Sequence, residues 1–483
     1  MKLNPESCYQ AVLTHDARFD GVFFVGIATT GIYCRTVCSA RRPRRENCTF
    51  YPSAAAAERA GYRPCLRCRP EMAPGRARAD AVGRLAAAAA ARIEDGALTE
   101  GSVGSLASEM GVTDRHLRRA LRSEFGVAPI ELAQTQRLLF ARRLLRDTTL
   151  PITEVAYVSG FSSVRRFNAL FHARYRTNPT TLRKSQTPAA QTGTLICELS
   201  FRPPLNWDAM LDFLSDRALP GVESVDRNSY YRTVALREHR GWIAVSRSLS
   251  RNTLRVELSA SLAPALPPLL ARLRRLFDLG ADPELIAERL GGLAIDDPGM
   301  RLPGAFSGFE TAVRAIIGQQ ISVRAANTLA GRLVESMGAP IESPFPALTR
   351  LSPTAERIAR ATPGEISAIG IVTSRANAII ALANAVIDRS LSFGPGVNIE
   401  RTMARLKQIP GVGDWTAEYI AMRALSWPDA FPHTDLGIRK ALGETNPARV
   451  LEMAEAWRPW RSYAVIRLWR SLKPLSPDTG SAM

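Results

Sequence analysis

The chain has 483 residues, of which 46% are hydrophobic, enough for about three or four domains with cores of their own. No run is long and apolar enough to span a bilayer and the start lacks the pattern of a secretory signal, so we expect a cytoplasmic protein with no membrane partner. The net charge of +18 is uneven, because residues 1–190 hold 29 Lys and Arg against 16 Asp and Glu, and this surplus predicts a polyanionic partner, most simply DNA.

Two close cysteine pairs dominate residues 1–78. Three residues lie between Cys34 and Cys38, two lie between Cys65 and Cys68, and 26 residues separate the pairs. In a reducing compartment this spacing predicts a tetrahedral Zn²⁺ site with four sulfur ligands rather than disulfides. Four buried or reactive thiols without a metal are the alternative.

The segments around these cysteines resemble the N-terminal domain of the Ada adaptive-response family, through FFVGIATTGIYCRTVCSARRP and NCTFYPSAAAAERAGYRPCLRCRP. The resemblance implies a structural zinc whose ligand Cys34 also accepts a methyl group from a methylphosphotriester in DNA. Zinc keeps sulfur as the nucleophilic thiolate at neutral pH. Methylation would change the charge of the site from about −2 to about −1, which weakens its repulsion from DNA. A purely structural zinc module is the alternative.

Arginines near the cysteines are candidates for holding the DNA phosphates. They are Arg35, Arg41, Arg42, Arg44, Arg45, Arg63, Arg67 and Arg69. The Ada family also has a second methyltransferase domain with a Pro-Cys-His-Arg motif. That motif is absent from this sequence, so direct repair of alkylated guanine oxygen is not predicted.

Residues 80–185 contain two similar segments, SVGSLASEMGVTDRHLRRALRSEFGVAP and PITEVAYVSGFSSVRRFNALFHARYRTNP. Each predicts a short helix, a glycine turn and a basic helix, which is the helix-turn-helix pattern whose second helix enters the major groove. Joined by a helix over QRLLFARRLLRD, the pair resembles the AraC-type regulator domain and implies RNA polymerase as a partner. A helical bundle with a basic face is the alternative. The candidate DNA-contacting side chains are Arg115, Arg118, Arg119, Arg165 and Arg166.

A polar segment, SQTPAAQTGT, predicts a linker before the second half of the chain. Residues 194–300 begin with alternating strands around one early helix, which predicts a small α+β domain, and helical patterns run from Leu266 onward into residues 301–476. The predicted fold class is therefore multidomain α+β: a small zinc domain, an all-α double helix-turn-helix, a small α+β domain and an all-α helix-hairpin-helix domain.

The most informative stretch is LKQIPGVGDWTAEYIAMRALSWPDAFPHTDLGIRKAL, residues 406–442. It predicts a helix, a tight hairpin at Gly411 and Gly413, a second helix, a loop and then Asp435. The free amides of the hairpin and of the next helix would bind a DNA phosphate. Arg439 and Lys440 follow on a new helix and would neutralise nearby phosphate. A non-specific DNA-binding hairpin with an ordinary capping aspartate is the alternative.

This pattern resembles the helix-hairpin-helix base-excision glycosylases. The second half as a whole is similar to the AlkA-type 3-methyladenine DNA glycosylases, through RLPGAFSGFE, AIIGQQISV and PWRSYAVIRLW. The resemblance implies an aromatic cleft for a flipped, positively charged purine, with Phe213, Trp415, Tyr419 and Trp469 at the matching positions. For each ring alone, ordinary core packing is the alternative.

In the glycosylase reading, the Asp435 carboxylate stabilises the oxocarbenium character of the sugar or activates a water. Bifunctional relatives carry a Schiff-base lysine where this chain has Trp415, so the resemblance implies a monofunctional enzyme that leaves an abasic site. Two positions depart from the family. Gln320 stands where the best-known form has a leucine wedge, and Arg470 stands where the cleft has a tyrosine, which puts the substrate range in doubt.

Together the two halves predict an alkylation sensor and transcriptional regulator fused to a base-excision enzyme that depends on Zn²⁺. One alternative is a transcriptional activator whose second half binds DNA without catalysis. Another is a repair enzyme whose first half only recruits it to DNA.

Overall fold

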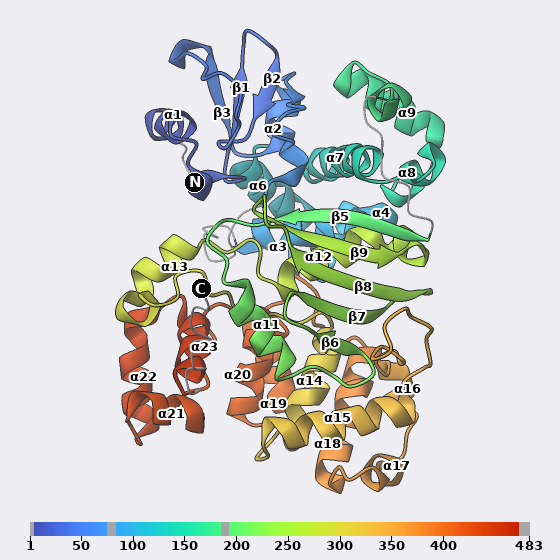
Figure 1. Cartoon of the computed structure of the whole chain (residues 1–483), viewed down its shortest axis with the longest axis vertical. Helices are drawn as coiled ribbons and strands as arrows, with labels where there is room; N and C mark the ends of the chain where they lie inside the picture. Colours follow the sequence, from blue (N-terminus) through green and yellow to red (C-terminus); the bar gives the residue numbers. More distant parts are fainter. Residues whose placement is uncertain (1–3, 75–83, 185–192, 473–483) are drawn as a thin grey trace, which may run out of the picture.

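The computed structural model describes residues 4–74, 84–184 and 193–472, and Figure 1 shows its four parts. The first part is a sheet in the order β3-β1-β2-β4 with two helices. Strand β2 pairs with β4 in parallel, so that Cys34 at the end of β2 and Cys65 just after β4 come side by side. The elements are α1 (Pro5–Leu13), β1 (Phe24–Ile27), β2 (Ile32–Cys34), β3 (Cys48–Tyr51), α2 (Ala54–Arg59) and β4 (Arg63–Pro64).

The second part contains the predicted pair of helix-turn-helix units. The glycine turns at Gly111 and Gly160 have positive φ, and the next helices are capped by the Thr113 and Ser163 hydroxyls. The elements are α3 (Arg84–Glu94), α4 (Ala97–Glu100), α5 (Val103–Glu109), α6 (Asp114–Phe125), α7 (Pro129–Asp147), α8 (Ile152–Val158), α9 (Val164–Tyr175) and α10 (Pro179–Lys184).

The third part is an antiparallel sheet in the order β5-β9-β8-β7-β6, with α11 inserted between its first two strands in the chain. The predicted early helix and the alternating strands are both present. The elements are β5 (Thr194–Ser200), α11 (Trp207–Ser215), β6 (Glu223–Val225), β7 (Ser229–Leu236), β8 (His239–Arg247), β9 (Thr253–Ser259) and α12 (Leu266–Leu276).

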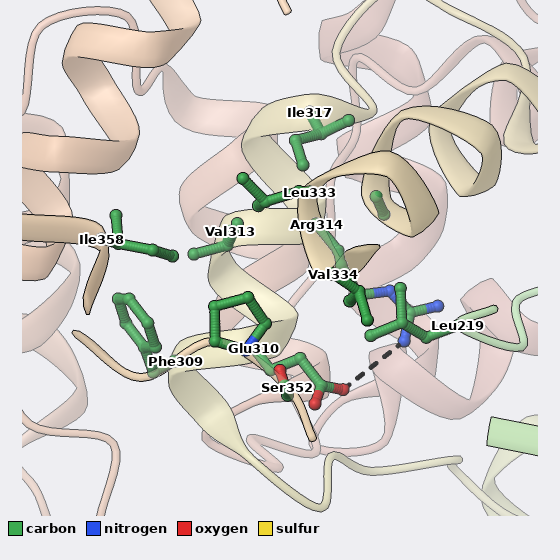
Figure 2. Close-up of a pocket in the computed structure, with 12 residues that line it drawn as sticks. Leu219, Phe309, Glu310, Val313, Arg314, Ile317, Leu333, Val334, Ser352 and Ile358 are labelled. Carbon is green, nitrogen blue, oxygen red and sulfur yellow. Dashed lines mark ion pairs between the residues drawn. The ribbon is translucent and has the colours of Figure 1, made fainter. Parts of the chain in front are cut away.

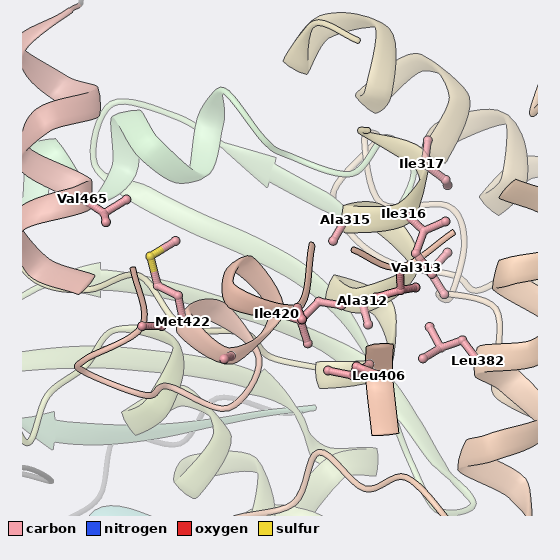
Figure 3. Packing of buried hydrophobic residues seen from close by; sticks show 14 of the residues in the cluster. Ala312, Val313, Ala315, Ile316, Ile317, Leu382, Leu406, Ile420, Met422 and Val465 are labelled. Carbon is pink, nitrogen blue, oxygen red and sulfur yellow. The ribbon is translucent and has the colours of Figure 1, made fainter. Parts of the chain in front are cut away.

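The fourth part is a helical domain around one apolar core, part of which Figure 3 shows. Phe213 of α11 and residues of α13 join this core, so the sheet and helical domains meet along α11 and α13. The elements are α13 (Pro283–Leu290), α14 (Gly308–Ile317), α15 (Val323–Met337), α16 (Ala355–Ala359), α17 (Pro363–Ala368), α18 (Thr373–Ile387), α19 (Ile399–Lys407), α20 (Asp414–Arg423), α21 (Leu436–Leu442), α22 (Pro447–Ala454) and α23 (Arg461–Ser471). No helix in the described ranges has the length and apolar character of a membrane span.

The two halves of the chain share a core. The second helix-turn-helix unit and the five-stranded sheet form one buried apolar cluster, which includes Phe167, Phe171 and Leu199. Arg202, just after β5, is fully buried and donates to the carbonyl of Asp20 in the zinc domain (2.9 Å). The predicted linker lies almost entirely outside the described residues, and the domain limits at residues 78, 80, 185 and 476 also lie at or beyond the edges of the described ranges.

A buried carboxylate joins the zinc domain to the helix-turn-helix domain. Glu58 of α2 accepts hydrogen bonds from the hydroxyls of Tyr33 (3.0 Å) and Thr135 (3.2 Å), and Arg174 of α9 lies 3.6 Å away. Burial raises the pKa of Glu58 to about 7, against the opposing pull of Arg174.

This shift predicts that the contact between the two domains weakens as the pH rises. A carboxyl group whose folded-state pKa lies above its unfolded value binds its proton more tightly when folded, so its contribution to stability is lost as the pH rises through about 7. Between about pH 6 and about pH 8 we expect a loss of about 1 kcal/mol in the opening free energy of α2, measured by amide hydrogen exchange corrected for intrinsic rates. Glu58→Gln should remove the pH dependence and exposed Glu46→Gln should keep it. A loss that persists in Glu58→Gln would contradict the assignment.

Candidate active site and zinc site

The predicted hairpin connects α19 and α20. Gly411 has φ +88°, a left-handed conformation that favours glycine, and Gly413 is the N-cap residue of α20. Among the described residues, the amides of Gly411 and Gly413 donate to no carbonyl, so both are available to a ligand. The Gln319 side chain donates to the Gly411 carbonyl (2.7 Å) and to the Thr416 hydroxyl (2.9 Å), which ties the turn after α14 to the hairpin. The hairpin therefore presents amides of the kind that bind phosphate.

Asp435 lies at the N-cap of α21 and its carboxylate is held from three sides. It accepts hydrogen bonds from the indole Nε1 of Trp415 (2.8 Å) and of Trp469 (2.9 Å), and from the amide of Ile438 (2.9 Å). These three hydrogen bonds fix the orientation of the carboxylate. Because α20 and α23 each contribute one tryptophan, three helices position this one side chain.

The aromatic rings predicted from the sequence come together around this carboxylate. The Trp415 and Tyr419 rings stack with centroids 5.4 Å apart, and Tyr419 and Trp469 lie 6.2 Å apart. Phe213 reaches the same place from α11 and is buried, with 8% of its surface exposed. Arg470, where the family has a tyrosine, is exposed and pairs with Asp297 at 3.8 Å, so the aromatic lining on that side ends with Trp469.

Three arginines next to the rings were not predicted. Arg217, Arg314 and Arg423 all lie close to Tyr419, and their charges together hold its pKa below 10.0 although burial alone would raise it. A sequence signal existed for one of them. Arg423 follows Tyr419 by four residues within α20, a spacing that places the two side chains on one face of that helix, whereas Arg217 lies beyond the end of α11.

The other predicted DNA-facing residues are exposed or lie next to exposed backbone. Gln320 is exposed, with φ +55°, in the turn between α14 and α15. Lys440 is exposed on α21, and Arg439 is half-buried, with a buried Nε that has no hydrogen-bond partner. At the hairpin, Asp414 forms an ion pair with Lys407. This pair offsets a negative charge that would otherwise repel phosphate.

The four cysteines form one cluster, with the sulfur atoms of Cys34, Cys38, Cys65 and Cys68 all within 4.8 Å of one another. Tetrahedral Zn²⁺ with Zn–S bonds of about 2.3 Å requires sulfur atoms about 3.8 Å apart. The cluster therefore fits the metal, and the prediction of a four-cysteine zinc site is confirmed. Cys34 is only 4% exposed, whereas Cys68 is the most exposed of the four. The amide of Arg35 donates to the Cys68 sulfur (3.4 Å).

Two of the arginines expected to hold phosphate are instead used inside the protein. Arg35 pairs with Asp20, and Arg69 pairs with Asp147 at the end of α7 (2.7 Å), so both guanidinium groups already neutralise a carboxylate. Both side chains are therefore less available to a DNA phosphate than those of the exposed arginines. Exposed arginines remain at Arg41, Arg42, Arg44, Arg63 and Arg67.

The candidate recognition helices keep most of their basic residues on the surface. Arg115, Arg119, Arg165 and Arg166 are exposed, while Arg118 forms an ion pair with Asp114 on α6. The exposed arginines of α6 and α9 are therefore accessible to DNA phosphates or bases.

Four family models match the chain in order. They are the metal binding domain of Ada (residues 7–71), a helix-turn-helix domain (106–185), the AlkA N-terminal domain (196–307) and the HhH-GPD superfamily base excision DNA repair protein (313–458). Fold and site together define the class: a DNA glycosylase of the helix-hairpin-helix type joined to a zinc-containing DNA-binding regulator.

Curated relatives narrow the class. A probable bifunctional transcriptional activator/DNA repair enzyme AlkA of Mycobacterium tuberculosis is 40% identical, covering 97% of this chain and 96% of that protein. DNA-3-methyladenine glycosylase 2 of Escherichia coli is 39% identical, covering 56% of this chain and 95% of that protein. The bifunctional activator/repair enzyme Ada of Escherichia coli is 35% identical, covering 29% of this chain and 38% of that protein. The chain belongs to the family of bifunctional transcriptional activator/DNA repair enzymes of the AlkA type.

Proposed function

We propose that the second half hydrolyses the N-glycosidic bond of alkylated purines, 3-methyladenine among them, and that Asp435 is its catalytic carboxylate. The observation that carries this is the position of Asp435. Its carboxylate is held by two indole N–H groups within a cluster of aromatic rings, and one of these indoles follows a hairpin with free amides. A merely capping aspartate would need only the amide of Ile438.

The geometry divides the work among the residues. The hairpin amides and Lys440 hold phosphates, and the turn at Gln320 enters the space left by the flipped nucleotide. Trp415, Tyr419, Trp469 and Phe213 receive the base. The C1′–N bond breaks and the base leaves with its electron pair, while Asp435 stabilises the positive sugar. A water then adds its oxygen to C1′ and gives up a proton, first to Asp435 and then to solvent.

The same arrangement supports a monofunctional enzyme. A lyase needs an amine that forms a Schiff base with C1′ of the sugar. Trp415 occupies the matching position, and its indole nitrogen is used as a donor to Asp435. The product is an abasic site.

For the first half we propose that Cys34 takes a methyl group from a methylphosphotriester. Bound zinc keeps the cysteines as thiolates at neutral pH. The Cys34 sulfur attacks the methyl carbon, the carbon–oxygen bond breaks, and the phosphate recovers its negative charge as a diester. The amide of Arg35 stabilises the Cys68 thiolate, which lowers its nucleophilicity relative to that of Cys34. The low exposure of Cys34 means that DNA must approach it closely.

The regulatory partners follow from this reading. Methylation removes one negative charge from the cysteine cluster, which raises the affinity for promoter DNA bound through Arg115, Arg118, Arg119, Arg165 and Arg166. The bound activator then recruits RNA polymerase. A reducing cytoplasm suits four thiolate ligands, so we place the protein there.

Replacing Trp469 by phenylalanine tests how the carboxylate is positioned. The change keeps an aromatic ring in the cleft but removes the N–H that donates to Asp435. Losing a hydrogen bond to a charged group should lower kcat for base release by roughly tenfold, with a smaller change in KM. The measurement is single-turnover release of free base from methylated duplex DNA.

Trp457→Phe is the matched control, because Trp457 packs against the same domain core without contacting Asp435. Equal rates for both variants and the wild type would show that the indole N–H of Trp469 has no part in the reaction.

A further inference from the structure

Arg217 differs from the other two arginines at the cleft in how it is held. Arg314 pairs with the buried carboxylates of Glu223 (3.0 Å) and Glu310 (3.7 Å), and Figure 2 shows the second pair. Arg423 donates to two backbone carbonyls and to the Tyr419 hydroxyl (3.1 Å). Within the described part of the chain, Arg217 has no ion pair. Its side chain donates a long hydrogen bond to the carbonyl of Phe213 (3.5 Å) and also forms a hydrogen bond with the Tyr419 side chain.

The guanidinium of Arg217 lies against the rings of the cleft. Its central carbon is 4.0 Å from the centroid of the Phe213 ring and 6.0 Å from that of Trp469. These are cation–π distances, so the arginine occupies a position where the rings would attract a positively charged base. Arg423 covers the Phe213 ring as well, at 4.7 Å. The rings are therefore already stabilised by cations of the protein itself.

The surroundings also give Arg217 room to move. It lines an open groove of about 530 Å³ beside the cleft, together with Asp216, Pro220, Arg324 and Asn327. In this groove the Arg217 side chain is in contact with solvent, whereas Arg314 and Arg423 are held by buried partners. Of the three cations, Arg217 is the one that can respond to the base that enters.

We propose that Arg217 sets the charge preference of the glycosylase: its guanidinium occupies the cation position of the aromatic cleft and disfavours positively charged purines relative to neutral purine lesions of the same shape. This inference rests on the proposed role of the rings as the base-binding cleft. When a cationic base enters, either Arg217 moves into the groove or the two positive charges repel each other. Like charges about 6 Å apart near a protein surface weaken binding by roughly tenfold to a hundredfold. A neutral base carries no such penalty.

The test isolates charge from shape. Full-length protein is titrated with two duplexes that differ at one nucleotide. One carries 7-methylguanine, a cation, on a 2′-fluorinated sugar that resists cleavage, and the other carries 7-methyl-7-deazaguanine, its neutral isostere. For Arg217→Gln we expect the ratio of the two Kd values to shift about tenfold in favour of the cation. Arg217→Lys, which keeps the charge, should keep most of the wild-type ratio.

Arg324→Gln is the control, since Arg324 lines the same groove and makes no cation–π contact with the rings among the described residues. It should weaken both duplexes alike if it contacts phosphate. An unchanged ratio in Arg217→Gln, or a shift toward the neutral base, would overturn the proposal while leaving the cleft assignment intact. If the wild type prefers neither lesion to undamaged DNA, the cleft assignment itself fails, and the role of Arg217 with it.

Discussion

Replacing Asp435 by asparagine should lower the rate of base release by about 10²–10³-fold. The carboxylate loses the charge that stabilises the sugar cation. In addition, the asparagine side chain has an NH₂ group in place of one carboxylate oxygen. This group cannot accept a hydrogen bond, so one of the two indole N–H groups loses its acceptor. Asparagine remains a good N-cap residue, so α21 should form normally. The measurement is single-turnover release of 3-methyladenine from methylated duplex DNA.

The control is Asp388→Asn, which changes an exposed aspartate at the end of α18, away from the cleft. Binding to duplex DNA containing an abasic site should be retained by both variants, because the hairpin and Lys440 are untouched. Base release by Asp435→Asn at more than a tenth of the wild-type rate would exclude Asp435 as the catalytic carboxylate.

The second large effect is expected at the zinc site. Cys34→Ala should remove all methyl transfer from methylphosphotriester DNA to the protein. It should also weaken Zn²⁺ binding more than tenfold, because one of four sulfur ligands is lost and metal binding is coupled to folding of the domain. Base release should persist, since the glycosylase core does not include this cluster. The measurements are label transfer from methylated DNA and competition with a zinc-binding dye.

Cys48→Ala is the matched control, because Cys48 is equally buried in the same domain but lies outside the cluster. Mass spectrometry of the methylated wild type should place the methyl group on Cys34. The methylated protein should bind promoter DNA more tightly than the unmethylated one, with a smaller loss at high salt. A methyl group on Cys68, the most exposed ligand, would show that the acceptor is misassigned.

Much of the site was predictable because its motifs are local. The hairpin glycines, the acid about twenty residues later and the helical spacing of Trp415 and Tyr419 lie within one continuous stretch. The paired cysteines are also close in sequence, and strand pairing between β2 and β4 only had to bring the two pairs together.

The remainder depends on contacts between distant segments. The hydrogen bond from Trp469 to Asp435 spans 34 residues, and the approach of Arg217 to Trp469 joins the segment after α11 to α23. Neither contact could be predicted from local spacing. For the arginines near the cysteines, local sequence suggested a role that distant contacts change. Sequence proximity predicted phosphate contacts for Arg35 and Arg69, but Asp20 and Asp147, elsewhere in the chain, pair with them. The core shared by the two halves was likewise invisible, because the linker reads as a polar spacer.

One experiment tests the central claim, that a single chain repairs alkylated bases and senses alkylated phosphates. Full-length protein is incubated with duplex DNA that carries radiolabelled methyl groups, and the label is counted in free purines and on the protein. The account predicts label in both fractions: as 3-methyladenine, and as methyl groups on Cys34 at no more than one for each protein molecule. Label on the protein without free purine, with DNA binding retained, would contradict the glycosylase and leave a regulator with a second DNA-binding domain.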